Sequence, residues 1–357
     1  MIPYYILITL PIIPLLFKHK GVKLGKNITI SKNEFSIGLF FVILFVLVSL
    51  RASTVGVDTP NYIYYFDSFC KMSWKELFFD KEPAYAILNK LISFISTNPN
   101  VLFFALALIY IFPIAKLYIE HIEIPTLTIA MFISMSTFVM LFSGIRQSIA
   151  IALGVIAFYF TKNKKLIPFI LVVLLAIMFH RSAFMIAFMY PLYHIKITKK
   201  WLLVVVPLML AVFVFNKPIF NFLAIFISGS YEVKVSSTGA YTMIVLFAML
   251  SVFSYVVVDE EKMDSITFGF RNFLLLATTL QMFAPLNSLA MRMNYYYIIF
   301  IPLLIPKIIK STSLRWRQVS NLATYVITVF FFVYFLFSVP AANSLHTFPY
   351  QFFWEVM

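Results

Sequence analysis

The sequence predicts an all-α, polytopic membrane protein with about twelve transmembrane helices, within a range of about 10 to 14. Of the 357 residues, 62% are hydrophobic and only 12% are charged, and the mean hydropathy is +0.94. Soluble domains carry about 25% charged residues. The apolar runs are roughly 15 to 20 residues long and lack the alternating pattern of a membrane β-barrel. Helices are then the structure that satisfies the backbone hydrogen bonds in lipid.

The same composition excludes several other classes of protein. The single cysteine, Cys70, excludes internal disulfides and a cysteine-based metal site. The first apolar segment, residues 2–17, lacks a basic start and a small-residue cleavage site, so we expect a retained helix. The net charge of +14 does not indicate nucleic acid, because membrane topology accounts for it.

Basic residues set the expected topology. The loop between the first two spans, 2–17 and 35–50, is basic and therefore cytoplasmic; it carries Lys18, Lys20, Lys23, Lys26 and Lys32. This places residues 51–100 outside, where an amphipathic helix over about 83–97 is expected to lie on the surface. Its polar face holds Asn89, Lys90, Ser93 and Thr97.

The rest of the chain follows as one multi-spanning domain over residues 1–357, with its C-terminus outside. A second outer loop is expected at 216–240, and its apolar first half is a candidate for dipping into the bilayer. The further spans are expected at about 101–119, 124–143, 145–160, 166–180, 182–194, 201–215, 241–258, 266–284, 295–310 and 319–338.

Lysine and arginine divide differently on this topology. Fifteen of the 21 lysines fall inside, whereas four of the seven arginines fall outside: Arg51, Arg146, Arg181 and Arg292. The planar guanidinium binds two oxygens at once and suits phosphate recognition. A cation at membrane depth also costs several kcal/mol unless it meets a polar cavity or an anion. These arginines therefore indicate an anionic ligand, although each could instead be an anchor that reaches lipid phosphates.

His180 and Asp58 are the candidate general bases. Each has a structural alternative, because a single histidine is often packed or at a helix end, and Asp58 precedes a helix expected to begin at Pro60. Glu82 precedes Pro83 in the same way. The acidic residues 259–261 lie on an inner loop, and the outer face has no paired carboxylates, so neither a metal nor a cofactor is expected.

Four short motifs follow one another along the chain. They are Gly56-Val57-Asp58-Thr59 with Tyr62 and Phe66, then Glu82-Pro83-Ala84-Tyr85, Ile145-Arg146-Gln147 and His180-Arg181-Ser182-Ala183. This ordered set resembles the EpsG-like branch of the Wzy bacterial polysaccharide polymerases. The resemblance covers about residues 51–195, and more weakly the region from Arg292 to Tyr295. Ala84 stands where the family usually has glycine.

The resemblance implies a metal-independent, GT-C-like membrane glycosyltransferase at the outer face of the bacterial cytoplasmic membrane. Such a polymerase makes O-antigen, capsule or exopolysaccharide by moving the growing glycan from undecaprenyl diphosphate onto a new lipid-linked repeat unit. Its expected partners are that lipid-linked oligosaccharide, the bilayer, and possible chain-length regulator and flippase proteins. Two alternatives stay open: a polysaccharide ligase, and a flippase or other transporter of lipid-linked oligosaccharide, which should carry internal repeats and midplane charges.

The expected site follows from the outer arginines together with the family resemblance. Arg146, Arg181 and Arg292 bind the diphosphate, with Arg146 taking part in catalysis, because arginines can stabilise a leaving anion without a metal. His180 or Asp58 acts as the base for a sugar hydroxyl. Hydrogen bonds and further binding contacts to sugar or phosphate are expected from Gln147, Tyr62, Tyr295, Arg51 and Glu82.

Overall fold

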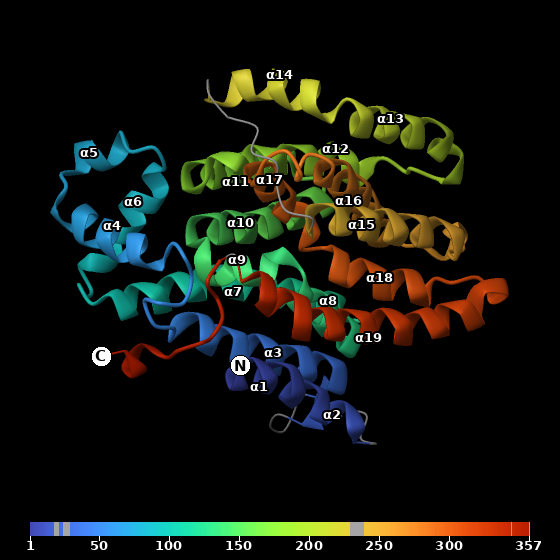
Figure 1. Cartoon of the computed structure of the whole chain (residues 1–357), viewed down its shortest axis with the longest axis horizontal. Coiled ribbons are helices and arrows are strands. Elements are labelled where there is room, and N and C mark those ends of the chain that lie inside the picture. Colours follow the sequence, from blue (N-terminus) through green and yellow to red (C-terminus); the bar gives the residue numbers. More distant parts are fainter. Residues whose placement is uncertain (18–20, 24–28, 229–238, 344, 357) are drawn as a thin grey trace. The chain divides into compact units, whose positions relative to one another are not determined.

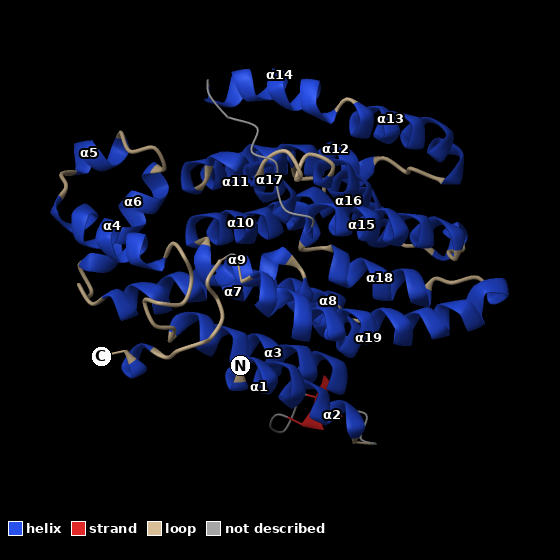
Figure 2. Ribbon diagram, in the orientation of Figure 1, coloured by secondary structure: helices blue, strands red, loops and turns tan. Residues whose placement is uncertain are grey.

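The computed structural model describes the whole chain except residues 18–20, 24–28, 229–238, 344 and 357. It divides into two compact units, one of residues 1–187 with 325–357 and the other of residues 188–324. Helices dominate both, which confirms the all-α prediction (Figure 2). The described residues also include one short hairpin, β1 (Gly21–Lys23) paired antiparallel with β2 (Thr29–Ser31), within the basic loop. Lys18, Lys20 and Lys26 of that loop lie outside the described residues.

Four helices of the described chain are long and apolar enough to cross a membrane: α3 (Lys32–Ser49), α7 (Pro99–His121), α10 (Ile145–Lys162) and α19 (Arg317–Ala342), the last with the turn η5 (Leu314–Trp316) before it. Two bent pairs raise the number to six. They are α8 (Pro125–Ser134) with α9 (Ser136–Ser143), bent by 61°, and α13 (Leu202–Val214) with α14 (Asn216–Ser228), bent by 77°. The span expected over 124–143 is therefore broken near Met135.

Consecutive helices of the first unit pack side by side. The N-terminal segment packs on α3, α3 packs on α7, α7 on α10, and α10 on α11 (Leu166–Phe179) (Figure 1). Edge-to-face aromatic pairs fill the interior, among them Phe40 with Phe132 and Phe138 with Phe142. The N-terminal segment consists of α1 (Ile2–Thr9), η1 (Leu10–Ile12) and α2 (Ile13–Leu16).

A group of shorter helices follows α3: α4 (Thr59–Lys71), α5 (Trp74–Phe78) and α6 (Pro83–Ser93). The loop into α4 turns at Gly56, whose φ of +94° favours glycine. A Cβ there would lie 2.6 Å from the carbonyl oxygen of Phe142, so no side chain fits. This close approach holds the start of α4 against the end of α9. The helix expected over 83–97 is shorter than predicted, because α6 ends at Ser93.

The C-terminal segment is tied to the loop before α4. The backbone N–H groups of Ala52 and Gly56 donate to the carbonyls of Gln351 and His346, both at 2.9 Å, and Phe353 N–H donates to Leu50 at 3.0 Å. The hydroxyl of Tyr350 adds a 2.8 Å hydrogen bond to the Leu47 carbonyl. The segment ends in the turn η6 (Phe353–Glu355). Segments joined by this many backbone hydrogen bonds lie on the same side of a membrane.

In the second unit, α16 (Ser265–Gln281) is the central helix. It packs against α12 (Met189–His194), α13, α15 (Gly239–Val256), α17 (Ser288–Ile298) and α18 (Ile301–Lys310). Gly269 permits one of these contacts, because a Cβ there would lie 2.1 Å from the ring of Tyr193. The short turns of this unit are η3 (Lys199–Trp201) and η4 (Glu260–Lys262).

Two sequence predictions are wrong in detail. The span expected over 182–194 is the 3-10 helix η2 (Arg181–Phe188) followed by α12. The span expected over 295–310 is interrupted between α17 and α18. The apolar first half of the outer loop expected over 216–240 forms the helix α14, and the Ser- and Gly-rich part around Glu232 and Lys234 lies outside the described residues. Hydropathy locates apolar stretches but does not locate the breaks within them.

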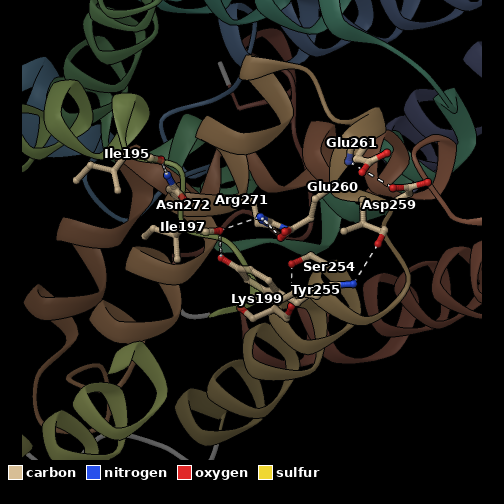
Figure 3. Close-up of polar contacts among 12 residues, drawn as sticks. Ile195, Ile197, Lys199, Ser254, Tyr255, Asp259, Glu260, Glu261, Arg271 and Asn272 are labelled. Atoms are coloured by element: carbon tan, nitrogen blue, oxygen red, sulfur yellow. Dashed lines mark hydrogen bonds and ion pairs between the residues drawn. The ribbon is translucent and has the colours of Figure 1, made fainter. Parts of the chain in front are cut away.

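Side chains of α16 donate hydrogen bonds to carbonyl groups at the end of α12 and just after it (Figure 3). Asn272 donates from Nδ2 to the carbonyls of Leu192 and Ile195, at 2.8 and 2.5 Å. Arg271 donates from Nη2 to the Ile197 carbonyl at 2.8 Å and to Glu260 Oε1 at 2.9 Å. The guanidinium is fully buried against the ring of Tyr255, 3.9 Å from its centroid. Buried carbonyls need such partners because water is excluded from them.

We expect Arg271→Gln to destabilise the protein by roughly 2 to 3 kcal/mol, because it removes one partner of a largely buried ion pair and the donor to the Ile197 carbonyl. Thermal unfolding in detergent measures this as a fall of several degrees in Tm. Arg317→Gln is the matched control, since Arg317 is exposed. Equal Tm values for the two variants would contradict this structural role of Arg271.

Candidate functional site

Three helices of the first unit begin close together: α4, α6 and α10. The backbone N–H of Asp58, at the start of α4, donates to Ser143 Oγ at 3.3 Å, just before α10. A 2.6 Å ion pair joins Glu82, which precedes α6, to Arg146 in the first turn of α10. Helix N-termini carry partial positive charge and unpaired N–H groups. Their convergence favours an anion at this end of the unit.

Glu82 holds two cation-forming side chains on its two carboxylate oxygens. Oε2 accepts from Nη1 of Arg146 at 2.6 Å, and Oε1 lies 2.8 Å from Nδ1 of His180. The backbone of Arg181 also helps to lower the pKa of this carboxylate. Although Glu82 occupies the N-cap position of α6, its side chain caps nothing there. The carboxylate therefore serves the cluster and not the helix.

The electrostatics of this cluster keep Glu82 ionised. Burial alone would raise the pKa of Glu82, but the hydrogen bond to His180 and the charge of Arg146 outweigh it, and the net pKa is lowered. The free-carboxyl pKa is about 4.3. A lowered folded-state pKa contributes stability above the unfolded value, and that stability is lost as pH falls through the folded value. Glu82 is consequently a carboxylate at neutral pH and a poor proton acceptor.

Arg146 stands where a positive charge is disfavoured, in the first turn of a helix. Its guanidinium lies over the rings of Tyr62 and Tyr85, 5.8 and 5.9 Å from their centroids. Burial raises the pKa of Tyr62, and the arginine partly opposes this. The Arg146 side chain is still 38% exposed, so part of the guanidinium remains open to a ligand.

His180 ends α11 and presents an oriented imidazole. Its ring contacts ionised Glu82 through Nδ1, so that nitrogen carries the proton and donates it to Oε1. Nε2 is then the acceptor of the neutral ring. The side chain is 19% exposed, and the adjacent Arg181 is exposed. His180 does lie at a helix end, as the structural alternative expected. Its ring is also held by the carboxylate of Glu82, which that alternative did not include.

Arg51 lies deeper than expected for a binding residue. It is 1% exposed, donates from Nη1 to the Val48 carbonyl, and stacks 4.6 Å from the centroid of the Phe103 ring. Its Nε and Nη2 have no acceptor among the described residues. Tyr62 and Tyr85 are among its electrostatic neighbours, as they are for Arg146. Tyr62 and Tyr85 therefore lie near both arginines. Direct binding of a ligand by Arg51 stays a prediction.

The other predicted residues divide between the two units. Asp58 is half-buried at the N-cap position of α4, makes no side-chain cap, and lies near Tyr62. Gln147 is buried in the first turn of α10. Arg292 and Tyr295 lie on α17 of the second unit, and their part in the site stays a prediction.

Tyr85 was not singled out by residue type, although it lies within the Glu82-Pro83-Ala84-Tyr85 motif. Its position against Arg146 depends on the packing of α6 on α4. Within the described residues, no three His, Cys, Asp or Glu side chains are grouped to hold a metal ion.

The fold and this cluster define an integral membrane protein with arginine, histidine and glutamate gathered where helices begin. The chain belongs to the EpsG family, whose model matches residues 35–352, nearly its whole length. This confirms the resemblance inferred from the motifs. Membership makes it a membrane protein of polysaccharide biosynthesis, in a bacterial family of glycosyltransferase-like polymerases that use lipid-linked saccharides. No curated protein and no solved structure matches the chain.

Proposed function

We propose that the chain polymerises polysaccharide by transferring a growing glycan from undecaprenyl diphosphate onto a new lipid-linked repeat unit. The reaction takes place at the outer face of the bacterial cytoplasmic membrane. The observation that carries this proposal is the pairing of Glu82 with both Arg146 and His180, at 2.6 and 2.8 Å. An arginine for the leaving diphosphate and an imidazole for the acceptor hydroxyl then stand side by side, as glycosyl transfer requires.

His180 is the proposed general base. Its Nδ1–H is donated to Glu82, so Nε2 takes the proton from a sugar hydroxyl of the acceptor. The acceptor oxygen then attacks the anomeric carbon of the donor as the bond from that carbon to the diphosphate oxygen breaks. The electron pair of the broken bond leaves with undecaprenyl diphosphate. Asp58 stays the second candidate for the base, and Glu82 becomes a positioning residue.

An excess of arginine supports an anionic leaving group. Arg51, Arg146 and Arg181 carry three positive charges, and Glu82 and Asp58 are the carboxylates beside them. Arg146 and Arg181 bind the diphosphate. Gln147 and Tyr62 are proposed to donate hydrogen bonds to sugar or phosphate.

The direct test of this function is reconstitution of the purified full-length protein in proteoliposomes with a lipid-linked repeat unit. A polymerase converts the repeat into a ladder of longer lipid-linked glycans. A flippase moves the repeat across the bilayer without joining it, and a ligase transfers it to a different acceptor. Transport without lengthening would overturn the proposal.

We expect polymerisation to continue in excess chelator, because arginines take the place of a metal at the leaving diphosphate in this proposal. Product ladders made with and without EDTA, after thorough dialysis, measure this. A metal-dependent glycosyltransferase assayed in parallel shows that the chelator is effective. Loss of activity that magnesium or manganese restores would contradict metal independence.

We further infer a GT-C-like arrangement with about twelve crossings and the cluster facing outward. The hydrogen bonds between residues 345–353 and the loop before α4 support an even number of crossings between the two segments. Ten crossings are one number that meets this requirement. The loops at 18–34, 161–166 and 195–201 are then inside.

Labelling of Lys164→Cys tests this topology. In a Cys70→Ser background, we expect a membrane-impermeant thiol reagent to label position 164 only after the membrane is permeabilised, because the residue lies in a short basic loop. Lys81→Cys, in the outer segment, is the matched position that should react in intact cells. Labelling of position 164 from outside would invert the topology and separate the cluster from the outer face.

A further inference from the structure

The helix α6 buries Tyr85, Ala86 and Ile92, but it also turns polar side chains inward and leaves large apolar side chains on its outward side. Asn89 is fully buried and donates to the Tyr85 carbonyl at 2.7 Å. Lys90 points inward as well, donating to the carbonyls of Cys70 and Met72 at 3.1 and 2.5 Å. The residues at helical spacing on the outward side are Ile87, Leu88, Leu91, Phe94 and Ile95, which we call the outward stripe.

The outward stripe is strongly exposed where α6 ends. Leu91 is 50% exposed and Ile95 is 82% exposed. At the other end, Phe79 of the preceding loop is 83% exposed. Such a set of large apolar side chains is rare on a surface that meets water and marks an interaction site. The neighbouring helix α4 gives a direct contrast, because its exposed residues include Asn61, Asp67 and Lys71.

We propose that α6 lies with its outward stripe in the outer leaflet of the bilayer, so that lipid acyl chains cover this face. The main support is continuity: α6 packs directly on α7, a candidate membrane span, and on the apolar helix α11. The exposed side of α7 carries Phe104, Leu108 and Phe112, four residues apart, which face lipid in a span. The hydrocarbon that meets α7 therefore extends to α6.

Charge at the edge of α6 fits the same occupant. Lys75 and Lys81 are exposed on α5 and on the loop before α6. Lysines flanking an apolar helical face reach anionic headgroups while their stems lie along the hydrocarbon. The acidic residues nearby are engaged within the protein: Glu76 accepts from Ser73, and Asp80 accepts from the Glu82 N–H.

This placement would fix the depth of the site. Glu82 immediately precedes Pro83, the first residue of α6, so a helix held in the outer leaflet holds this carboxylate at the level of the lipid headgroups. That is the level at which the diphosphate of a lipid-linked donor lies. This consequence rests on the proposed function, whereas the lipid contact itself does not.

Spin labelling of the full-length protein in phosphatidylcholine and phosphatidylglycerol nanodiscs tests the lipid contact. In a Cys70→Ser background, a nitroxide on Leu91→Cys should relax more with oxygen, which partitions into lipid, than with a water-soluble nickel chelate. A nitroxide on Tyr64→Cys, exposed on α4, should show the opposite preference. Relaxation of the position 91 label mainly by nickel would mean that water covers α6. Protection from both reagents would mean that protein covers it, such as a second copy of the chain, and either result overturns the proposal.

Polymerisation supplies an independent measurement. Leu91→Asp should lower the yield of long glycans roughly tenfold at equal protein level, because a carboxylate is costly at a lipid-facing position. Tyr64→Asp should leave it unchanged. The spin-label result does not depend on catalysis, so it tests the lipid contact of α6 separately from the polymerase proposal.

Discussion

Arg146→Lys is expected to reduce polymerisation about a hundredfold or more, although it keeps the positive charge. Arg146 already uses Nη1 for Glu82 and lies over the rings of Tyr62 and Tyr85, so only the breadth of the guanidinium lets it reach a phosphate as well. A lysine has one ammonium group and cannot serve Glu82 and a diphosphate together. Loss of a contact made mainly in the transition state costs about 3 kcal/mol, by analogy with oxyanion-hole donors.

The measurement is the rate of chain lengthening in proteoliposomes, with protein level and Tm recorded beside it. Arg317→Lys is the matched control, because it makes the same change at an exposed arginine outside the cluster. Arg181→Lys combined with Arg146→Lys should cost less than the sum of the single losses, since both residues are proposed to bind one leaving group. Normal polymerisation by Arg146→Lys, or a defect confined to protein accumulation, would make Arg146 a structural anchor.

The sequence predicted the site best where a charged residue type stands between two apolar segments. Arg146 and His180 were marked by their cost in a membrane, and both lie in the cluster. The prolines also located the helix starts: α4 begins at Thr59, one residue before the expected Pro60, and α6 begins at Pro83. The role of Glu82 was harder to predict. A carboxylate before Pro83 suits an N-cap, and only the packing of α6 near α10 and α11 shows that its oxygens face Arg146 and His180 instead.

The face of α6 was also beyond the sequence. Its pattern predicts an amphipathic helix, and Asn89 and Lys90 were expected on its outer polar side. The partners of these residues, the carbonyls of Tyr85, Cys70 and Met72, come from α4, the turn after it and α6 itself. Periodicity defines two faces of a helix but not which one turns inward. That choice depends on the carbonyl groups left unpaired nearby, which a pattern of residues does not reveal.

His180→Ala is expected to lower polymerisation by about 10² to 10⁴-fold while leaving the lipid-linked donor bound, because a general base acts on the acceptor hydroxyl and not on the diphosphate. Steady-state kinetics should therefore show a fall in kcat with little change in KM. Glu82→Gln should cost less, because the amide oxygen still accepts from Nδ1 but the charge that holds Arg146 is gone.

The pair can be tested together. If Glu82 acts by orienting His180, adding Glu82→Gln to His180→Ala should lower the rate by less than Glu82→Gln does alone, and the remaining loss reports its hold on Arg146. His194→Ala, an exposed histidine of the second unit, is the matched control and should polymerise normally. Because the pKa of Glu82 is lowered, its protonation does not account for any loss of activity between pH 7 and about 5. A His180→Ala protein that polymerises at the normal rate would transfer the role of base to Asp58, and a loss confined to donor binding would place His180 on the diphosphate.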